Sequence, residues 1–506
     1  MPARAFGRGA GGESDVQTPY LLVLDEGTTS TRAMLFAVDG TVAAIEQAEL
    51  TQHYPADGHV EHDAAEIWTK TLACARRTVE KAGGAERIAA IGITNQRETV
   101  VAWDRQTGEP ITRAIVWQDR RTAGFCEQLR ADGHEQLIRE RTGLVVDPYF
   151  SGTKMRWILD NVPEAAALGD RLALGTVESW LVWKLTGGLH ITDATNASRT
   201  MLMPLDKAAW DADLLALLGV PASALPEIVD TAGRFGTTLP DLLGGPIPIC
   251  GLAGDQQAAT IGQNCLTAGQ VKATLGTGAF VLASTGHDLP RSNNRLLGTV
   301  LAQCDGKRSY ALEGSVFVAG SLVKWLRDQL GFVGTAAETE ALARSVPDNG
   351  GVCIVPALSG LGAPHWRPEA RGLIGGLTQG ATRAHIVRAA LESMAHQMHD
   401  LQQAYAADGS PWATLRLDGG MSANDWVAQD LADMLDLEVE RPHNVETTAL
   451  GAAMLAAVGC GLHATLTDAA AMRSGVSLFE PGMDAATRER RLDQWRALLA
   501  LELGQA

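Results

Sequence analysis

A short polar turn near the start of the chain has the composition of a phosphate-binding loop. It covers residues 25–32. Its hydroxyl residues are Thr28, Thr29 and Ser30. Successive backbone amides and hydroxyls can surround an anion, Asp25 offers an oxygen ligand to Mg²⁺, and Arg32 can neutralise phosphate charge. The alternative interpretation of these residues is an ordinary threonine-rich hairpin.

A second turn of the same kind occurs half a chain later. Residues 270–274 are typical of a strand and run into the turn 276–278, just as apolar runs at 21–24 and 32–36 flank the first turn. A strand–turn–strand unit that occurs twice predicts a duplicated domain in which the two turns face one another. Thr277 is then the counterpart of the first turn's hydroxyls. Two chance hairpins are the alternative.

Charged residues follow two further apolar runs. Asp255 comes shortly after the predicted strand 247–252, and ligands of α/β proteins bind outside the carboxyl ends of such strands. Its carboxylate is therefore a candidate general base. Arg97 and Glu98 follow the predicted strand 88–93, where a guanidinium donates to a polyol and a carboxylate accepts from it. The plainer alternatives are a helix N-cap and a surface ion pair.

A glycine turn at 418–424 is a candidate nucleotide site. It joins a predicted strand at 415–417 to the start of a helix. Its glycines allow a nucleotide to lie against the backbone, and Asn424 can reach a sugar or a phosphate. An ordinary helix cap by the same asparagine is the alternative.

The elements that position these motifs alternate between strands and helices, which predicts an α/β protein. A helix is predicted at 63–81 with Asp63 as its N-cap. Apolar residues at helical spacing predict a core-facing helix at 384–405. The repeated turn divides the chain into an N-terminal domain, 19–264, and a C-terminal domain, 265–506.

The composition excludes several classes of protein. Hydrophobic residues make up 46% and charged residues 20% of 506, which excludes collagen, coiled coils and wholesale disorder. A formal net charge of −17 argues against a general nucleic-acid binder. Seven cysteines without a CxxC pair indicate reduced cytosolic thiols, and no apolar run reaches the roughly 18 residues of a membrane span. We expect residues 1–18 to be a disordered tail, whose GxGxxG pattern lacks a preceding strand.

Together these motifs resemble those of the FGGY carbohydrate kinases. The matching segments are the two turns and 149–157, 254–257, 360–366 and 418–420. The resemblance runs from about Tyr20 to about Gly482. It implies the actin-like fold of that family, with two duplicated ribonuclease-H-like domains and an active site in the cleft between them. It also implies ATP and Mg²⁺ as cofactors.

Within the family, residues 93–99, 117–122 and 195–201 resemble most closely the members that phosphorylate glycerol. By position, the residues implied to bind the glycerol hydroxyls are Arg97, Glu98, Tyr149, Asp255 and Gln256. Those implied to pack against its carbons are Trp117 and Phe280. Asp255 is the implied catalytic base, and Asp25 and Asp255 are the expected ligands of Mg²⁺.

The resemblance also implies a nucleotide site. The residues expected at the ATP phosphates are Thr28, Thr29, Ser30, Arg32 and Thr277. Those expected at the nucleoside are Gly320, Lys324, Gly420 and Asn424. Two positions depart from the family pattern. Glu26 replaces a common Gln and is expected to add negative charge beside the phosphate turn, and Lys324 replaces a Gln that commonly contacts the nucleotide.

The expected activity is ATP-dependent phosphorylation of glycerol to sn-glycerol 3-phosphate. The resemblance implies a homodimer or homotetramer. The cysteine usage, the acidic balance and the lack of a long apolar run lead us to expect a cytoplasmic protein that binds no nucleic acid and does not insert into a membrane. Three alternatives stay open. One is a family member acting on another polyol or sugar, such as xylulose or gluconate. Another is an actin-like nucleotide switch without a small-substrate pocket. The third is a catalytically weak relative with a binding role, motivated by the departures at Glu26 and Lys324.

Overall fold

Two large sheets form the centre of the molecule. The computed structural model describes residues 19–504, so the predicted tail and its GxGxxG pattern, at Gly7, Gly9 and Gly12, lie outside the described residues. The N-terminal sheet has a parallel centre and antiparallel edges. Its strands, in spatial order, are β11 (Ala232–Thr237), β12 (Pro248–Gly254), β5 (Ile88–Asn95), β1 (Tyr20–Glu26), β2 (Ser30–Ala37) and β3 (Val42–Glu49).

The C-terminal sheet repeats this pairing. Its strands, in spatial order, are β15 (Leu297–Cys304), β16 (Lys307–Val316), β14 (Ala279–Gly286), β13 (Gln270–Leu275), β19 (Thr414–Asp418), β20 (Val439–Pro442) and β21 (Val476–Phe479). β1 pairs antiparallel with β2 and parallel with β5, and β13 pairs antiparallel with β14 and parallel with β19. The predicted α/β fold with a duplicated core is confirmed.

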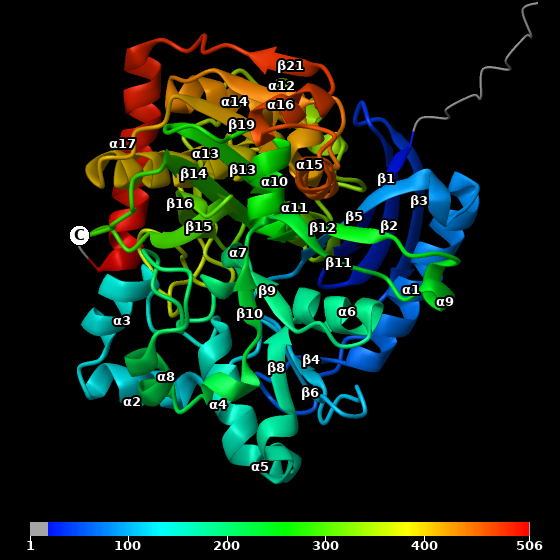
Figure 1. Cartoon of the computed structure of the whole chain (residues 1–506). Helices are drawn as coiled ribbons and strands as arrows, with labels where there is room; N and C mark the ends of the chain where they lie inside the picture. The colour runs from blue at the N-terminus through cyan, green and yellow to red at the C-terminus, as the bar shows by residue number, and fades with distance from the viewer. Residues whose placement is uncertain (1–18, 505–506) are drawn as a thin grey trace, which may run out of the picture.

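Helices lie beside and between the two sheets (Figure 1). Those on the distal faces are α1 (Ala64–Ala82) and α6 (Val177–Thr186) on the N-terminal sheet, and α13 (Arg383–Ala407) and α14 (Asp425–Leu435) on the C-terminal sheet. Those between the sheets are α10 (Asp255–Gly262) and α15 (Thr447–Cys460). The helices predicted at 63–81 and 384–405 are confirmed as α1 and α13, and Asp63 caps α1.

A smaller α/β lobe is built mostly from the segment between β5 and β12, with one short strand, β4 (Glu61–His62), contributed from before α1. Its sheet contains β4, β7 (Ala114–Ile115), β6 (Val100–Asp104) and β8 (Leu172–Thr176). Its helices are α2 (Ala123–Ala131), α3 (Glu135–Thr142), α4 (Ser151–Asn161), α5 (Pro163–Leu168), α7 (Ala194–Ala197) and α8 (Ala212–Leu218). Other helices of the C-terminal half are α11 (Gly320–Asp328), α12 (Glu338–Arg344), α16 (Leu466–Ala469) and α17 (Ala485–Leu503). Within residues 19–504, no helix combines the length and apolarity that crossing a bilayer requires.

Glycines allow α10 and α15 to touch through their backbones. A Cβ on Gly451 would lie 1.8 Å from the carbonyl oxygen of Ala258, and one on Gly262 would lie 2.0 Å from that of Thr447. Only glycine fits at such distances, so each helix meets the other without a side chain between them. α15 also packs on the N-terminal sheet, and α10 touches strands of the C-terminal sheet. The two halves of the chain therefore share one core.

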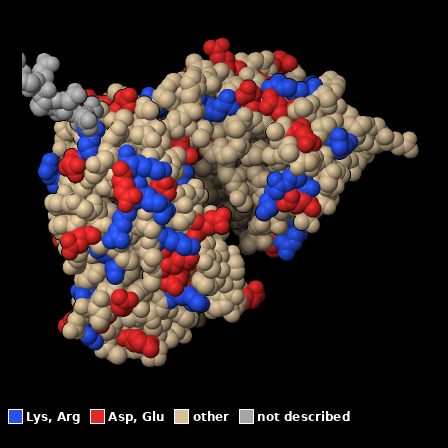
Figure 2. Space-filling model, turned by 90° about the vertical axis from the view of Figure 1, so that its right-hand side faces the viewer, with Lys and Arg blue, Asp and Glu red and all other residues tan. Residues whose placement is uncertain are grey.

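Figure 2 shows a deep hollow between two parts of the molecule, on the face turned to the viewer. Basic and acidic side chains alternate over this face and do not gather into a field of one sign. This face therefore carries no basic patch of the kind that binds a polyanion.

Replacing Gly451 by alanine tests the contact between α10 and α15. Because the new methyl group overlaps a backbone oxygen, we expect the free energy of unfolding to fall by about 3 kcal/mol or more. Gly124→Ala is the matched control, since Gly124 is exposed on α2 and no atom lies within 4 Å of its Cβ position. Urea unfolding of both variants makes the comparison. Equal stabilities for the two would refute the contact.

Candidate functional site

The predicted functional residues gather where the strand ends of the two sheets meet. Asp25 ends β1, Arg97 follows β5 and Asp255 follows β12, so these residues share the carboxyl edge of the N-terminal sheet. Thr277 follows β13 in the C-terminal sheet. This is the edge at which α/β proteins bind their ligands.

Four buried charges, here called the ion cluster, join the two halves: Arg97, Glu98, Arg199 and Glu313. Glu313 lies on β16 of the C-terminal sheet and accepts hydrogen bonds from Arg97 Nη1 at 2.6 Å and from Arg199 Nη2 at 3.0 Å. Arg199 Nε donates to Glu98 Oε1 at 2.7 Å. All four side chains are at most 2% exposed. The surface ion pair considered for Arg97 and Glu98 is therefore wrong.

The ion cluster perturbs the pKa values of its acids in opposite directions. Burial alone would raise the pKa of Glu313, but Arg199 and Arg97 outweigh it and hold that pKa at about 2. Burial raises the pKa of Glu98, against the opposing effect of the same two arginines. Glu98 also has a φ of 62°, a conformation that non-glycine residues rarely adopt. Such strain is concentrated at functional sites.

Asp255 lies at the edge of the ion cluster. Its Oδ1 is 3.3 Å from Arg97 Nε, and 32% of its side chain is exposed. Burial raises the pKa of Asp255, while Arg97 opposes the shift. Beside it, Gln256 Oε1 accepts a 2.6 Å hydrogen bond from the buried Lys272 Nζ on β13. The carboxylate is thus held by protein groups and still reachable from solvent.

Three aromatic rings border the same place. Trp117 stands nearly perpendicular to Tyr149 at a centroid distance of 5.6 Å and to Phe280 at 6.5 Å. Tyr149 Oη accepts from Arg97 Nη2 at 3.3 Å, and Trp117 Nε1 donates to Thr28 Oγ1 at 3.0 Å. The rings therefore connect the ion cluster to the first turn. Apolar faces beside fixed donors and acceptors suit a small polyol.

The first turn is held at its base by an ion pair. Asp25 Oδ2 accepts from both Nε and Nη2 of Arg32, whose Nη1 donates to Glu446 at 2.6 Å. Thr29 is exposed and Ser30 is partly buried. The arginine expected to meet phosphate is thus already paired with two carboxylates, and its guanidinium spans from the turn to the start of α15.

Glu26 corrects one expectation from the sequence. Its side chain is buried on the α1 side of β1, where Oε1 accepts from the hydroxyls of Thr31 and Thr71, each at 2.7 Å. Burial raises the pKa of this carboxyl to about 8. Glu26 is therefore neutral near pH 7, and the predicted negative charge beside the phosphate turn is wrong.

The second turn is built by close backbone approach. Gly320 N donates to Gly276 O at 2.9 Å, and the backbone amides of Ala319 and Ser321 both donate to Thr277 O at 3.0 Å. A Cβ on Gly320 would lie 2.6 Å from Gly276 O. The glycine expected at the nucleoside therefore touches the turn expected at the phosphates.

The remaining residues of the predicted nucleoside site differ in the contacts that they make. Gly420 has no atom within 4 Å of its Cβ position, so space is open beside it. Asn424 Oδ1 caps α14 by accepting from the amides of Trp426 and Val427, which is the alternative role considered for it. Lys324 is exposed on α11.

The acidic residues at the sheet edge fit Mg²⁺. Asp25 and Asp255 offer hard carboxylate oxygens on either side of β5, and Mg²⁺ usually takes one or two carboxylates together with substrate phosphates. Within residues 19–504, no group of three or more His, Cys, Asp or Glu side chains is gathered for an all-protein metal site. The donor set thus suits an ion that arrives with phosphate.

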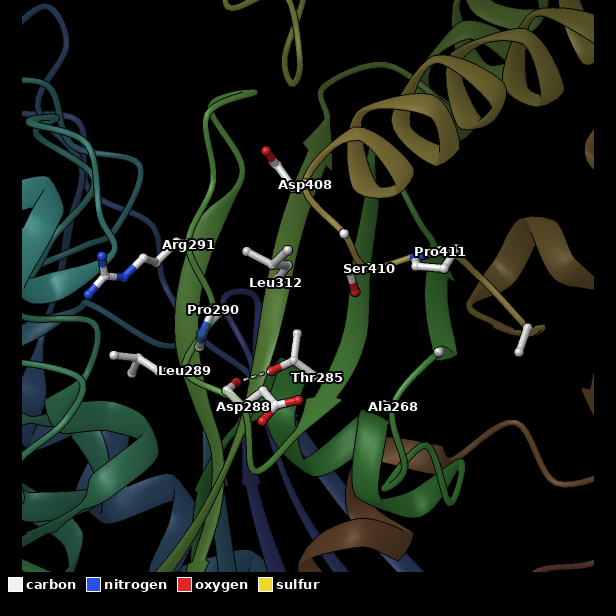
Figure 3. Close-up of a pocket in the computed structure, with 13 residues that line it drawn as sticks. Ala268, Thr285, Asp288, Leu289, Pro290, Arg291, Leu312, Asp408, Ser410 and Pro411 are labelled. Carbon is white, nitrogen blue, oxygen red and sulfur yellow. Dashed lines mark hydrogen bonds between the residues drawn. The ribbon is translucent and has the colours of Figure 1, made fainter.

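A cavity of about 390 Å³ lies elsewhere, at the amino end of β13 (Figure 3). It is bordered by 268–269, 285–291 and 408–413, where Thr285 Oγ1 donates to the backbone oxygen of Asp288. It is lined by none of the predicted site residues. Turn 276–278 follows the opposite end of the same strand, so this cavity is separate from the candidate site.

Four residues of the site escaped sequence reasoning: Arg199, Gln257, Lys272 and Glu313. Arg199 lies inside a segment that resembles the family, yet nothing in its spacing points to Glu98. Gln257 Oε1 accepts from Arg97 Nη1 at 3.4 Å. Gln257 directly follows Asp255 and Gln256, so its position in the sequence could have identified it. Lys272 and Glu313 lie within strands, and no local pattern distinguishes them.

Comparison with known proteins follows the same division of the chain. Residues 20–262 match the N-terminal domain model of the FGGY family of carbohydrate kinases, and residues 271–460 match its C-terminal domain model. A glycerol kinase of Methylobacterium nodulans is 54% identical over 496 residues, covering 96% of this chain and 99% of its own. A glycerol kinase of Rhodospirillum rubrum is 53% identical over 482 residues, covering 94% and 97%.

Solved structures agree. Plasmodium falciparum glycerol kinase with ADP superposes with a TM-score of 0.91 at 33% identity, covering 96% of this chain and 98% of its own. A xylulose kinase from Rhodospirillum rubrum gives 0.85 at 27% identity, covering 95% and 98%. The whole architecture is thus shared with kinases of small polyols and sugars.

Glu26→Gln tests the neutral state of the buried carboxyl. The folded protein keeps this proton up to about pH 8, whereas the unfolded chain releases it near 4.5, the ordinary pKa of a glutamate side chain, so stability falls as pH rises between those values. The amide carries no such proton. We expect E26Q to raise the free energy of unfolding by about 3 kcal/mol at pH 7 and to lose this advantage below about pH 4.5.

Urea unfolding across pH 4–9 measures this difference. Glu49→Gln, at an exposed position on β3, is the control and should follow the wild-type curve at every pH. If the E26Q and wild-type curves stay parallel over this range, the carboxyl of Glu26 is ionised in the folded protein.

Proposed function

The chain belongs to the FGGY family of carbohydrate kinases, and we propose that it transfers the terminal phosphoryl group of ATP to glycerol, forming sn-glycerol 3-phosphate and ADP. The observation that carries this proposal is the convergence of Arg97, Glu98 and Asp255 with the rings of Trp117 and Phe280. Polar groups on one side and aromatic faces on the other match a three-carbon triol. Relatives that cover nearly the whole chain are glycerol kinases.

Asp255 acts on the acceptor, glycerol. Its carboxylate takes the proton of the attacking hydroxyl, which raises the nucleophilicity of that oxygen at the moment of transfer. The remaining hydroxyls bind Arg97, Glu98 and Tyr149, with Gln256 beside them. The aromatic rings cover the carbon atoms. Phosphoryl transfer depends mostly on such positioning and on charge stabilisation.

The two turns bind the phosphates of ATP. Thr28, Thr29, Ser30 and Arg32 meet the phosphates from one side and Thr277 from the other, while Gly320, Lys324, Gly420 and Asn424 border the nucleoside. Asp25 and Asp255 would hold Mg²⁺, which neutralises charge on the phosphates when it is bound. Thr29 and Thr277 are exposed at the two turns, which supports a site where a triphosphate is held from both sides.

We also propose a cytoplasmic enzyme that acts as a homodimer or homotetramer. The seven cysteines are free thiols, which supports a reducing compartment. The oligomeric state is inherited from the family resemblance, and sedimentation of the purified protein measures it.

An assay of ADP release with Mg-ATP tests the substrate. We expect turnover with glycerol that exceeds the rates with xylulose, ribulose, gluconate or no acceptor. A sugar-specific rate would keep the phosphate site and replace the proposed acceptor. Hydrolysis that is independent of any acceptor would identify a nucleotide switch, and ATP binding without turnover would identify a catalytically weak relative.

Asp255→Asn tests the general base. The amide keeps the shape of the carboxyl but cannot take a proton, so we expect kcat to fall by at least about a hundredfold. Thermal unfolding of the variant checks that the fold is intact. A kcat close to that of the wild type would remove Asp255 from the role of base.

A further inference from the structure

We propose that Glu313 is a positioning residue for the acceptor site, acting through Arg97 and Arg199 from the opposite half of the molecule. This inference rests on the proposed function, because it concerns the residues that bind the hydroxyls of glycerol there. Glu313 lies within β16, in the C-terminal sheet, whereas Arg97, Arg199 and Glu98 lie between β5 and β12 of the N-terminal half.

One carboxylate fixes the direction of both arginines. Glu313 receives Arg97 through two nitrogens, Nη1 at 2.6 Å and Nη2 at 3.2 Å, and such a paired contact sets the plane of a guanidinium. The Nε edge of Arg97 is thereby left facing Asp255 at 3.3 Å. The same carboxylate accepts Arg199 Nη2 at 3.0 Å, which leaves Arg199 Nε on Glu98 at 2.7 Å. Both acids of the acceptor site are thus oriented indirectly by Glu313.

Features of the ion cluster argue against a purely stabilising role. Buried ion pairs are often no better for stability than apolar side chains of similar volume. Here Glu98 has a strained φ of 62°, and Arg199 Nη1 is buried without a hydrogen-bond partner. A cluster that served stability alone has no reason to keep a strained residue and an unmatched donor. Both are typical of groups held ready for a ligand.

Loss of the Glu313 charge should misdirect the arginines. Without this partner, Arg97 is drawn by Asp255 and by Glu98, whose Oε1 is 3.9 Å from Arg97 Nε. The guanidinium then turns toward these acids and away from the substrate hydroxyls. The hydrogen bonds that the acceptor hydroxyls receive are then weaker, so the affinity for glycerol falls.

Glu313→Gln tests the assignment, with Asp430→Asn as the matched control. Asp430 on α14 receives Arg491 of α17 through two nitrogens at 2.6 and 2.9 Å and is also buried, at 5% exposed, but it lies outside the site. We expect E313Q to raise the KM for glycerol at least about tenfold while the KM for ATP stays within about twofold of wild type. D430N should lower the unfolding temperature and leave both KM values unchanged.

Arg199→Lys is the second variant, and it decides alone if E313Q does not fold. Lysine keeps the positive charge but has one nitrogen, so it cannot hold Glu98 and Glu313 at fixed angles together. The same selective rise in the KM for glycerol is expected. Equal changes in both KM values, or a KM for glycerol within about twofold of wild type in the folded variant, would overturn the proposal.

Calorimetric titration with glycerol separates this failure from failure of the proposed function. A wild-type protein that neither binds nor phosphorylates glycerol refutes the proposed function and the role of Glu313 together. A wild-type protein that does both, beside an E313Q variant that binds glycerol equally well, refutes the role of Glu313 alone. Weaker binding to E313Q and R199K, with normal binding to D430N, supports it.

Discussion

The backbone contact between α10 and α15 determines how the two halves of the molecule face one another. Because Gly262 and Gly451 bring these helices within backbone distance, the sheets on either side are held at a fixed separation. Trp117 links the segments after β1 and β13, because it donates to Thr28 of the first turn and packs against Phe280, which follows the second. The proposed acceptor site and the proposed phosphate site each contain residues from both halves of the chain. Both sites therefore depend on this geometry.

Charge interactions also join the two halves of the molecule. The ion cluster contains two arginines and two glutamates, and Asp255 lies at its edge with a raised pKa. Its partners come from both halves of the chain, so each half supplies charges that the other needs in order to be buried. Uncompensated charges are costly in a protein interior. The junction therefore constrains how the two halves assemble.

The sequence predicted local features well and tertiary ones poorly. The hairpins around 25–32 and 276–278, the long helices and the residues just beyond strand ends follow from nearby patterns. Glu313 becomes important only because β16 lies opposite Arg97, more than two hundred positions earlier in the chain. The charge state of Glu26 was wrongly predicted for the same reason, since its burial depends on Thr71 of α1. Beyond local patterns, the resemblance to a known family contributed most to the predicted site.

The shared core also sets an order of events during synthesis. One face of the N-terminal sheet, with Leu21, Val23 and Phe36 among its buried residues, is covered by α15. The last strand of this sheet, β12, ends at Gly254, and α15 is complete only roughly 200 residues later. At the usual rate of about 5–20 residues per second, that interval is on the order of 10–40 s. For that time an apolar sheet face lacks its final cover. The N-terminal half of the molecule therefore completes its packing only late in synthesis.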